Sequence, residues 1–189
     1  MLNDLKNTII RSQRTQRNWD LSKSIKDEDL NLFKIAVSQC PTKQNRIWYK
    51  VVFVKDRNII EKIYDTTDGF TYTENDTITN SQTLANLLAV FCIDEDKRRK
   101  ITKSNTDNSK ISIGVASGYL NLVAHLLNYK TGYCACFNKK EVDKILDVEK
   151  SELILGIGYP DYTKDRREHH KVKDFLYPTF NKDVEIKVI

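Results

Sequence analysis

Two short segments of this chain carry side chains suited to binding a charged ligand. In the first, Arg11, Arg14 and Arg17 are spaced three residues apart, with the hydroxyls of Ser12 and Thr15 between them. Guanidinium groups offer forked donors that match phosphate oxygens, and a nearby hydroxyl can add another hydrogen bond. A helix that continued through all three arginines would place them on one face. The cluster predicts a phosphate site, and the alternative is a solvated helix face.

The second segment is Pro41–Asn45, which joins a predicted helix to a predicted strand at residues 47–54. Here the Thr42 hydroxyl and the Asn45 amide can bond either a ligand or the local backbone, and in isolation the backbone is favoured. Together with the basic cluster, the segment suits a phosphorylated, flat ligand with polar edges. Neither a P-loop nor a GxGxxG turn after a strand is present, which excludes those two modes of nucleotide binding.

Length and composition predict one globular domain over residues 1–189, because a chain of this size fills one substantial core. Hydrophobic residues make up 40% and charged residues 30%, too apolar a balance for a disordered chain. No apolar run approaches membrane-spanning length, and residues 1–6 lack a signal-peptide core, so we expect a cytoplasmic protein without a membrane partner. The net charge of +5 fits an anionic small ligand or a weak nucleic-acid surface.

The cysteines and histidines do not suggest a metal site. Cys40 and Cys92 are isolated, and Cys134 and Cys136 are separated by one residue, unlike the spacing of redox or zinc motifs. The three histidines do not fall near them. We expect four reduced structural thiols and no metal.

Hydrophobic periodicity predicts helices over 3–13, 24–39, 56–65, 109–128 and 139–148, the second with a capping box at Ser24 and Asp27. In the long helix, Gly114 and Gly118 allow a close backbone approach, for which an ordinary helix contact is favoured over a ligand. Strands are predicted over 47–54, 84–93 and 153–159, with residues 66–80 as a loop and 94–108 at the surface. The tail 183–189 alternates apolar and charged residues and should pair with a sheet edge in this subunit or another.

Taken in order, these segments resemble the nitroreductase family of FMN-dependent oxidoreductases. Residues 14–19 match its opening Arg-Ser-x-Arg-x-aromatic stretch, and Pro41–Asn45 followed by Trp48 matches its Pro-Ser-x-x-Asn turn and tryptophan-containing strand. Residues 119–127 resemble its central helix. Two further matches are Thr131-Gly132-Tyr133, the turn after that helix, and Leu153–Pro160, the late strand that ends in Gly-Tyr-Pro. The resemblance extends from about residue 11 to 170.

Three departures from the family pattern matter. Gln13 stands where the first motif arginine is expected, so Arg11 is a candidate substitute, and Thr15 and Thr42 replace serines. The family commonly holds a lysine or arginine beside the flavin pyrimidine, whereas residues 79–82 contain no cation. This difference predicts a lower flavin potential, and a lysine at position 82 is expected to raise it.

The resemblance implies an α+β, nitroreductase-like fold with a central, mostly antiparallel sheet flanked by helices, in an intertwined homodimer with FMN between the subunits. Its implied reaction passes hydride from NAD(P)H through FMN to an electron-poor acceptor such as a nitroaromatic or quinone, and no obligate protein acid or base is expected. The implied cofactor-binding residues are Arg11, Arg14, Thr15, Arg17, Pro41, Thr42, Lys43, Asn45, Asn80, Gln82, Ala135, Cys136, Phe137, Arg166 and Arg167.

Two alternatives stay open from the sequence. One is a flavin enzyme of the same fold with different chemistry, such as flavin fragmentation or reductive dehalogenation. The other is a basic nucleic-acid-binding module that uses the arginine cluster and residues 97–100. That reading requires aromatic side chains interleaved with the cations, and only Trp19 and Tyr72 are candidates, so it ranks last.

Overall fold

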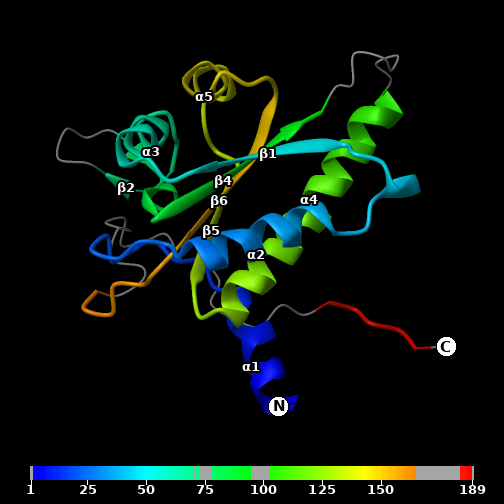
Figure 1. Ribbon diagram of the computed structural model, residues 1–189, viewed down its shortest axis with the longest axis horizontal. Helices are drawn as coiled ribbons and strands as arrows, with labels where there is room; N and C mark the ends of the chain where they lie inside the picture. Colours follow the sequence, from blue (N-terminus) through cyan, green and yellow to red (C-terminus); the bar gives the residue numbers. More distant parts are fainter. Residues whose placement is uncertain (1, 70, 73–77, 95–102, 165–183, 189) are drawn as a thin grey trace.

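The computed structural model describes residues 2–69, 71–72, 78–94, 103–164 and 184–188. Its centre is an antiparallel four-stranded sheet in the order β1-β4-β6-β5 (Figure 1). These strands are β1 (Tyr49–Val54), β4 (Leu87–Ile93), β5 (Lys130–Cys134) and β6 (Ser151–Gly158). The helices are α1 (Leu2–Ser12), α2 (Asp27–Ser38), α3 (Arg57–Tyr64), α4 (Lys103–Leu126) and α5 (Lys139–Leu146). Shorter elements are η1 (Lys43–Asn45), η2 (Ser81–Leu84), β2 (Thr71–Tyr72) and β3 (Ile78–Thr79). The predicted α+β class and central antiparallel sheet are confirmed.

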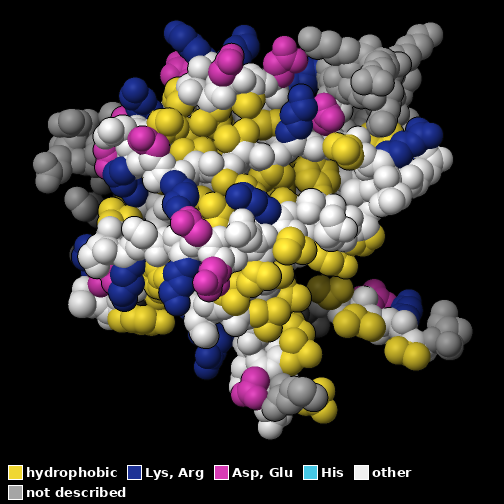
Figure 2. Space-filling view, viewed as in Figure 1, with side chains coloured by type: hydrophobic (Ala, Val, Ile, Leu, Met, Phe, Trp, Pro, Cys, Tyr) yellow, Lys and Arg dark blue, Asp and Glu magenta, His cyan; other side chains and the backbone are white. Residues whose placement is uncertain are grey.

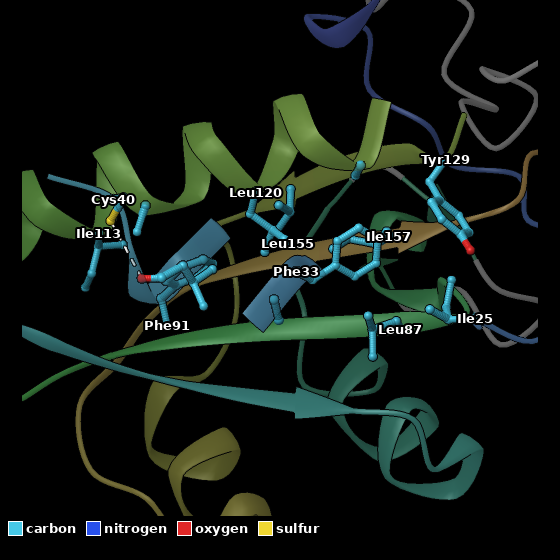
Figure 3. Close-up of a cluster of buried hydrophobic side chains, with 14 residues drawn as sticks. Ile25, Phe33, Cys40, Leu87, Phe91, Ile113, Leu120, Tyr129, Leu155 and Ile157 are labelled. Carbon is cyan, nitrogen blue, oxygen red and sulfur yellow. Dashed lines mark hydrogen bonds between the residues drawn. The ribbon is translucent and has the colours of Figure 1, made fainter. Parts of the chain in front are cut away.

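Helices cover both faces of the sheet, which explains why the two central strands are apolar almost throughout. On one face, α2 and α4 pack over a core that contains Phe33, Leu87, Phe91, Leu120 and Tyr129 (Figure 3). The rings of Phe33 and Tyr129 meet edge to face, with centroids 5.6 Å apart. On the other face, α3 and α5 lie over a second apolar cluster (Figure 1). The core is therefore layered as helix, sheet and helix.

The long helix α4 starts at Lys103, six residues before the predicted start, and ends at Leu126. Its apolar stripe, including Ile113, Ala116 and Leu120, is buried as predicted. Gly114 and Gly118 point away from the core, and a Cβ added at either position would meet nothing within 4 Å. The close approach that their spacing suggested is thus not made inside the described part of this chain.

The helix starts are set by different residues from those the pattern suggested. The predicted capping box does not form, because α2 begins at Asp27 with Lys26 at the N-cap position and no side-chain cap. Acidic residues occupy its first turn instead, where their negative charges interact favourably with the positive end of the helix dipole. In contrast, Asp56 caps α3 by accepting a hydrogen bond from the N–H of Ile59 at 3.0 Å.

One strand was missed, because Thr131–Tyr133 was expected to be a turn. These residues belong to β5, where Gly132 pairs with Gly156 of β6. A central glycine weakens the strand pattern in sequence, and pairing with a neighbouring strand overrides it. Two smaller corrections apply nearby: Leu84 belongs to η2, and the predicted loop 66–80 contains the short antiparallel pair β2–β3.

Several apolar side chains remain at the surface of this chain. They include Leu2, Leu5 and Ile9 of α1 and, in the C-terminal segment, Val184, Ile186 and Val188. Figure 2 shows hydrophobic side chains around α1 and on that segment. Residues 184–188 form no strand here, so their predicted sheet pairing is not made with the described part of the chain. No helix among the described residues is long and apolar enough to cross a membrane.

All four cysteines are free thiols. Cys40, Cys92 and Cys134 are buried, as expected for structural thiols, whereas Cys136 is exposed. Burial raises the pKa of Cys92 to about 11 and that of Cys134 to about 12. The thiols of Cys92 and Cys134 therefore stay protonated at neutral pH, the form that is a poor nucleophile.

Candidate functional site

The three arginines do not lie on one helical face, because α1 ends at Ser12. Arg11 belongs to its last turn, and the N–H of Arg14 donates to the Arg11 carbonyl at 3.0 Å. Arg17 follows in an irregular segment. The predicted cluster is therefore assembled by a helix end and the chain after it, not by helical spacing.

Residues 14–20 run across the ends of β5 and β6. The N–H of Gln16 donates to the carbonyl of Thr131 at 2.8 Å, and Thr15 pairs with Thr131 in a parallel bridge. Further along, Trp19 pairs with Pro160 in an antiparallel bridge. Since backbone pairing fixes the path of this segment, the positions of its side chains are set by the sheet.

Trp19 anchors this segment on η2. Its indole N–H donates to the carbonyl of Ser81 at 2.9 Å, and the side chain is only 8% exposed. A buried indole cannot stack on a nucleic-acid base, which removes one aromatic that the nucleic-acid alternative needs. The side chain of Tyr72 and residues 97–100 lie outside the described parts.

Arg17 is held by Gln82, and this links two predicted site residues. With the amide oriented to satisfy its neighbours, the Gln82 oxygen accepts from the Arg17 guanidinium at 3.1 Å. The Gln82 amide nitrogen then donates to the carbonyl of Tyr133. Gln82 is buried, so its position suits a brace for Arg17. Lysine at position 82 would put a second cation against Arg17, so the substitution expected to raise the potential would disturb this pair.

A glycine makes this close packing possible. A Cβ on Gly132 would lie 2.7 Å from the Gln16 carbonyl oxygen and 2.9 Å from the Gln82 Cβ. Asn80, another predicted site residue, accepts from the N–H of Gln82 at 3.2 Å and caps η2. Its own N–H is bonded to the Thr67 hydroxyl at 2.8 Å. Asn80 therefore shapes the turn that carries Gln82.

The predicted segment Ala135–Phe137 lies next to the end of α3. The carbonyl of Cys136 accepts from the N–H of Asp68 at 2.9 Å, and Phe137 pairs with Thr67 in an antiparallel bridge. Phe137 is buried, while Ala135 and Cys136 are exposed. Through Thr67 and Asn80, this segment is connected to the Arg17–Gln82 pair.

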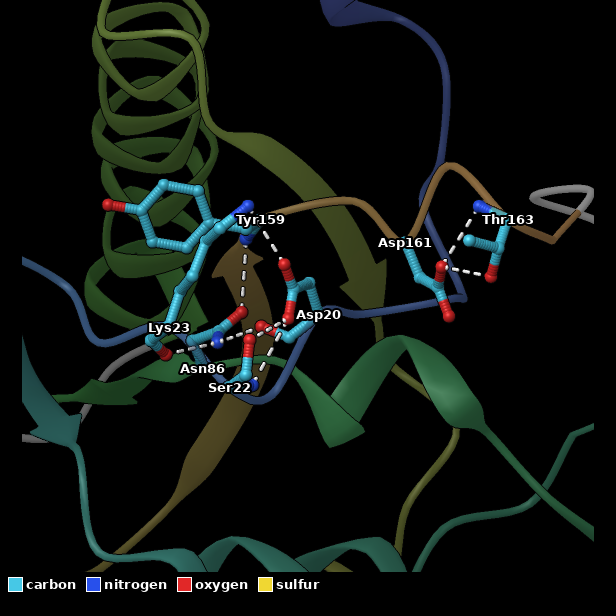
Figure 4. Close-up of polar contacts among 7 residues, drawn as sticks. All are labelled: Asp20, Ser22, Lys23, Asn86, Tyr159, Asp161 and Thr163. Atoms are coloured by element: carbon cyan, nitrogen blue, oxygen red, sulfur yellow. Dashed lines mark hydrogen bonds and ion pairs between the residues drawn. The ribbon is translucent and has the colours of Figure 1, made fainter.

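A polar network holds the end of the segment formed by residues 14–20 (Figure 4). Asn86 donates to the carbonyls of Asp20 and Lys23, both at 2.8 Å, and accepts from the N–H of Tyr159 at 3.0 Å. Lys23 forms an ion pair with Asp20 at 2.8 Å. This ion pair and the Ser22 hydroxyl lower the pKa of Asp20 to about 2.

The second predicted segment forms an exposed turn, whose Lys43 carbonyl accepts from the Trp48 indole at 3.1 Å. Gln44 and Asn45 adopt positive φ angles of 57° and 51°, and the Thr42 hydroxyl donates to the carbonyl of Arg46 at 2.8 Å. The backbone role favoured for Thr42 in isolation is thus confirmed. Lys43 contacts the Asn108 side chain of α4 at 3.4 Å. A cavity of about 450 Å³ opens beside the turn, lined by Val37, Thr42, Asn45, Tyr49, Val51 and Phe53, among others.

The two predicted halves of the site lie far apart in one chain. The carbonyl of Ser12 bonds to Asn121 of α4 at 3.0 Å, while Lys43 contacts Asn108 of the same helix. At 1.5 Å per residue, the stretch of α4 from Asn108 to Asn121 spans about 20 Å. The structure therefore brings Arg17 and Gln82 together but leaves Thr42 and Asn45 at the other end of α4.

Comparison with known proteins agrees with this architecture. The model of the nitroreductase family matches residues 10–159. The chain belongs to the nitroreductase family. Family membership makes it an oxidoreductase. A search among curated proteins finds no match.

Solved structures share the nitroreductase fold at low sequence identity. A nitroreductase family protein from Clostridium novyi aligns with a TM-score of 0.69 and 14% identity, over 87% of this chain and 90% of the other. Nitroreductase A from Vibrio parahaemolyticus gives 0.70 and 18%, over 94% and 78%. An FMN-dependent nitroreductase from Clostridium difficile gives 0.62 and 18%, over 88% and 95%.

In this nitroreductase family member, one basic residue near the site escaped the sequence pattern. Lys130 opens β5 next to Thr131 and was hidden in the stretch expected to be a turn. The only sequence signal for a role of Lys130 was its position next to Thr131. That signal is useful only once Thr131 is known to pair with Thr15, and this pairing cannot be read from the sequence. The predicted Arg166 and Arg167 lie outside the described residues, so their role stays a prediction.

Proposed function

We propose that this chain is an FMN-dependent oxidoreductase that passes hydride from NAD(P)H to an electron-poor acceptor such as a nitroaromatic or a quinone. Family membership supports the class of reaction. The observation that carries the cofactor assignment is the Arg17–Gln82 pair, in which a guanidinium three residues after Arg14 is held by a buried amide. A positive charge fixed in this way suits a ligand that is both anionic and flat.

The basic residues present fit the phosphate of FMN. Among the described residues, no carboxylate forms an ion pair with Arg11 or Arg14. Both side chains are exposed and can bind an anion without first giving up a protein partner. Charge-assisted hydrogen bonds from guanidinium groups to phosphate are among the strongest available to a side chain. In this proposal Arg11, Arg14 and Thr15 bind the phosphate, together with Arg166 or Arg167.

When bound, FMN would supply the hydride chemistry, which no protein side chain can provide. The chain's own contribution is to bind, orient and set the electrostatics. Arg17 would place a positive charge near the edge of the ring that gains negative charge on reduction, and Gln82 keeps that charge in place. The exposed segment Ala135–Cys136 is proposed to contact the ring from the side of α3.

A second copy of the chain is proposed to complete the site. The turn Pro41–Asn45 contacts α4 at Asn108, about 20 Å along the helix from Asn121, which bonds to the chain just before the arginines. In a homodimer, the turn of one subunit can reach the arginines of the other. Exposed apolar residues on α4, such as Ile111 and Tyr119, support an interface there. Each subunit is proposed to be a single domain, and the cytoplasm its compartment.

The first experiment is the absorbance spectrum of the purified protein, in which bound oxidised flavin gives a yellow colour. Changing Arg14→Ala together with Arg17→Ala should abolish FMN retention after gel filtration while the circular dichroism spectrum is unchanged. Each charge-assisted bond to a bound anion contributes about 1.5–3 kcal/mol, enough to empty the site when two are lost. The matched control removes two exposed lysines elsewhere, Lys62→Ala with Lys144→Ala.

The second experiment tests the reaction. Under anaerobic conditions, NADH or NADPH should bleach the flavin absorbance, and a quinone or nitroaromatic should restore it. A protein that binds FMN but is never reduced by a nicotinamide would point to another chemistry on this fold. A colourless protein that cannot be reconstituted with FMN would contradict the cofactor assignment.

A further inference from the structure

Lys130 brings a third positive charge to the end of α1. The bridge between Thr15 and Thr131 sets Lys130 and Arg14 in neighbouring positions on paired segments. The N–H of Arg14 bonds in turn to the carbonyl of Arg11 at 3.0 Å, closing the turn after the helix. The side chain of Lys130 is half-buried, unlike those of the two arginines.

This arrangement is unfavourable without a bound anion. Burial, followed by the positive charges of Arg11 and Arg14, lowers the pKa of Lys130. No carboxylate in the described ranges forms an ion pair with any of the three. Some lysines elsewhere are paired with carboxylates, such as Lys55 with Asp27 at 2.9 Å. Since like charges that share a partly buried site disfavour one another, an anion between them would replace repulsion with attraction.

The direction of Lys130 connects it to the proposed flavin site. Side chains alternate along a strand, so Lys130 and Gly132 lie on the same face of β5. On that face, Gly132 is packed against Gln82, which holds Arg17. Thr131 points to the opposite face, where its hydroxyl bonds to Asn121 at 2.5 Å. Lys130 and the Arg17 guanidinium held by Gln82 therefore lie on the same side of β5.

We propose that Lys130 binds the phosphate group of the flavin nucleotide and makes the site selective for FMN over riboflavin, which has the same ring but no phosphate. This inference rests on the proposed function and extends it to Lys130, which is not among the cofactor-binding residues that the resemblance implies. In this proposal the anion binds among the three cations, of which Lys130 is the one already partly shielded from water. Shielding strengthens its attraction to a dianion.

The test compares two flavins on four proteins. Dissociation constants of FMN and riboflavin are measured by fluorescence titration of the full-length, flavin-stripped chain as wild type, Lys130→Met, Lys130→Arg and the control Lys62→Met. Lys130→Met should weaken FMN by about tenfold, equivalent to one charge-assisted contact, and leave riboflavin unchanged. Lys130→Arg should restore most of the FMN affinity, and Lys62→Met should change neither constant.

Thermal unfolding of the same flavin-free proteins gives an independent readout. Lys130→Met should unfold at the same or a higher temperature than wild type, because the substitution removes repulsion from Arg11 and Arg14. Inorganic phosphate should raise the unfolding temperature of the wild type more than that of the variant. If Lys130→Met does not fold, Lys130→Gln replaces it in both measurements.

Three results would overturn the inference. Equal weakening of FMN and riboflavin, with a lower unfolding temperature, would assign Lys130 a structural role. Unchanged FMN affinity in Lys130→Met, with wild type binding FMN normally, would place the phosphate elsewhere and leave the proposed function intact. A wild type that binds neither flavin would contradict the proposed function itself, and this inference with it.

Discussion

The two ends of α4 carry the two predicted halves of the site, and they are built differently. At one end, residues 14–20 are tied to β5, β6 and η2 by backbone pairing and by the buried side chains of Trp19 and Gln82. At the other end, the turn Pro41–Arg46 is largely exposed. It is held by the Thr42 hydroxyl on Arg46, by the Trp48 indole, which donates to the Lys43 carbonyl at 3.1 Å, and by the Lys43–Asn108 contact. The first end has more of its geometry imposed by distant parts of the chain.

This difference suggests that the two ends of α4 have different roles in a dimer. Satisfied polar groups in a buried network fix side-chain positions, which preorganises the arginine end for an anion. The exposed turn carries its side chains about 20 Å along α4 from the arginines of the same chain. The contrast is what we expect if the turn acts on a neighbouring copy.

The largest expected effect comes from removing Trp19, which anchors residues 14–20 at the arginine end of α4. Trp19→Ala removes a buried ring and its hydrogen bond to Ser81, and should lower the free energy of unfolding by about 3–5 kcal/mol. Ile47→Ala at the exposed turn should change it by less than about 0.5 kcal/mol, because the Ile47 side chain is 71% exposed. Urea unfolding of both variants measures the difference. Similar losses in the two variants would mean that the ends are equally ordered.

A smaller effect is expected from one methyl group at the same end. Gly132→Ala would place a Cβ against the Gln16 carbonyl and the Gln82 side chain, and should cost about 1–3 kcal/mol of stability. The contrast is Gly118→Ala, whose added methyl meets nothing within the chain; an isolated subunit would gain about 0.5–1 kcal/mol from it, and a partner packed on this face of α4 would reduce or reverse that gain. Both values come from chemical denaturation.

Each glycine variant can fail in an informative way. An unaffected Gly132→Ala protein would show that residues 14–18 can move off β5, so the arginine end would not be preorganised. A destabilised Gly118→Ala protein would place a partner subunit on that face of α4.

The smallest expected effect is on the pH dependence of stability, through Asp20 at the end of residues 14–20. Lys23 and Ser22 hold the pKa of Asp20 at about 2, below its ordinary value of 3.8. A depressed carboxyl pKa contributes stability that is present above pH 3.8 and is lost as the pH falls towards 2. The unfolding temperature of Asp20→Asn should therefore depend less on pH in this window than that of wild type. The exposed Asp65→Asn at the end of α3 serves as control, and identical pH profiles for all three proteins would remove Asp20 from the account.

The sequence pattern was sufficient for the class of fold because its strongest signals are local. The apolar run in β4 and the amphipathic helices could be read directly, and the resemblance supplied the order of the motifs. Long-range pairing could not be read in the same way. β5 was hidden by its glycine, Lys130 went unnoticed with it, and the link from Arg17 to Gln82 joins residues that are far apart in the chain. The expected helical face of arginines failed because α1 stops at Ser12, where tertiary pairing takes over.

The most direct test of the central claim, a flavin site shared between two copies, is complementation. One protein carries Arg14→Ala with Arg17→Ala, and the other carries Thr42→Ala with Asn45→Ala. Each homodimer should lose FMN. Coexpressed with two different tags and purified as the mixed dimer, they should regain one FMN for every two chains, because one site then combines intact arginines with an intact turn from the partner. A mixed dimer as empty as its parents would show that both halves must come from the same chain, and would contradict the account.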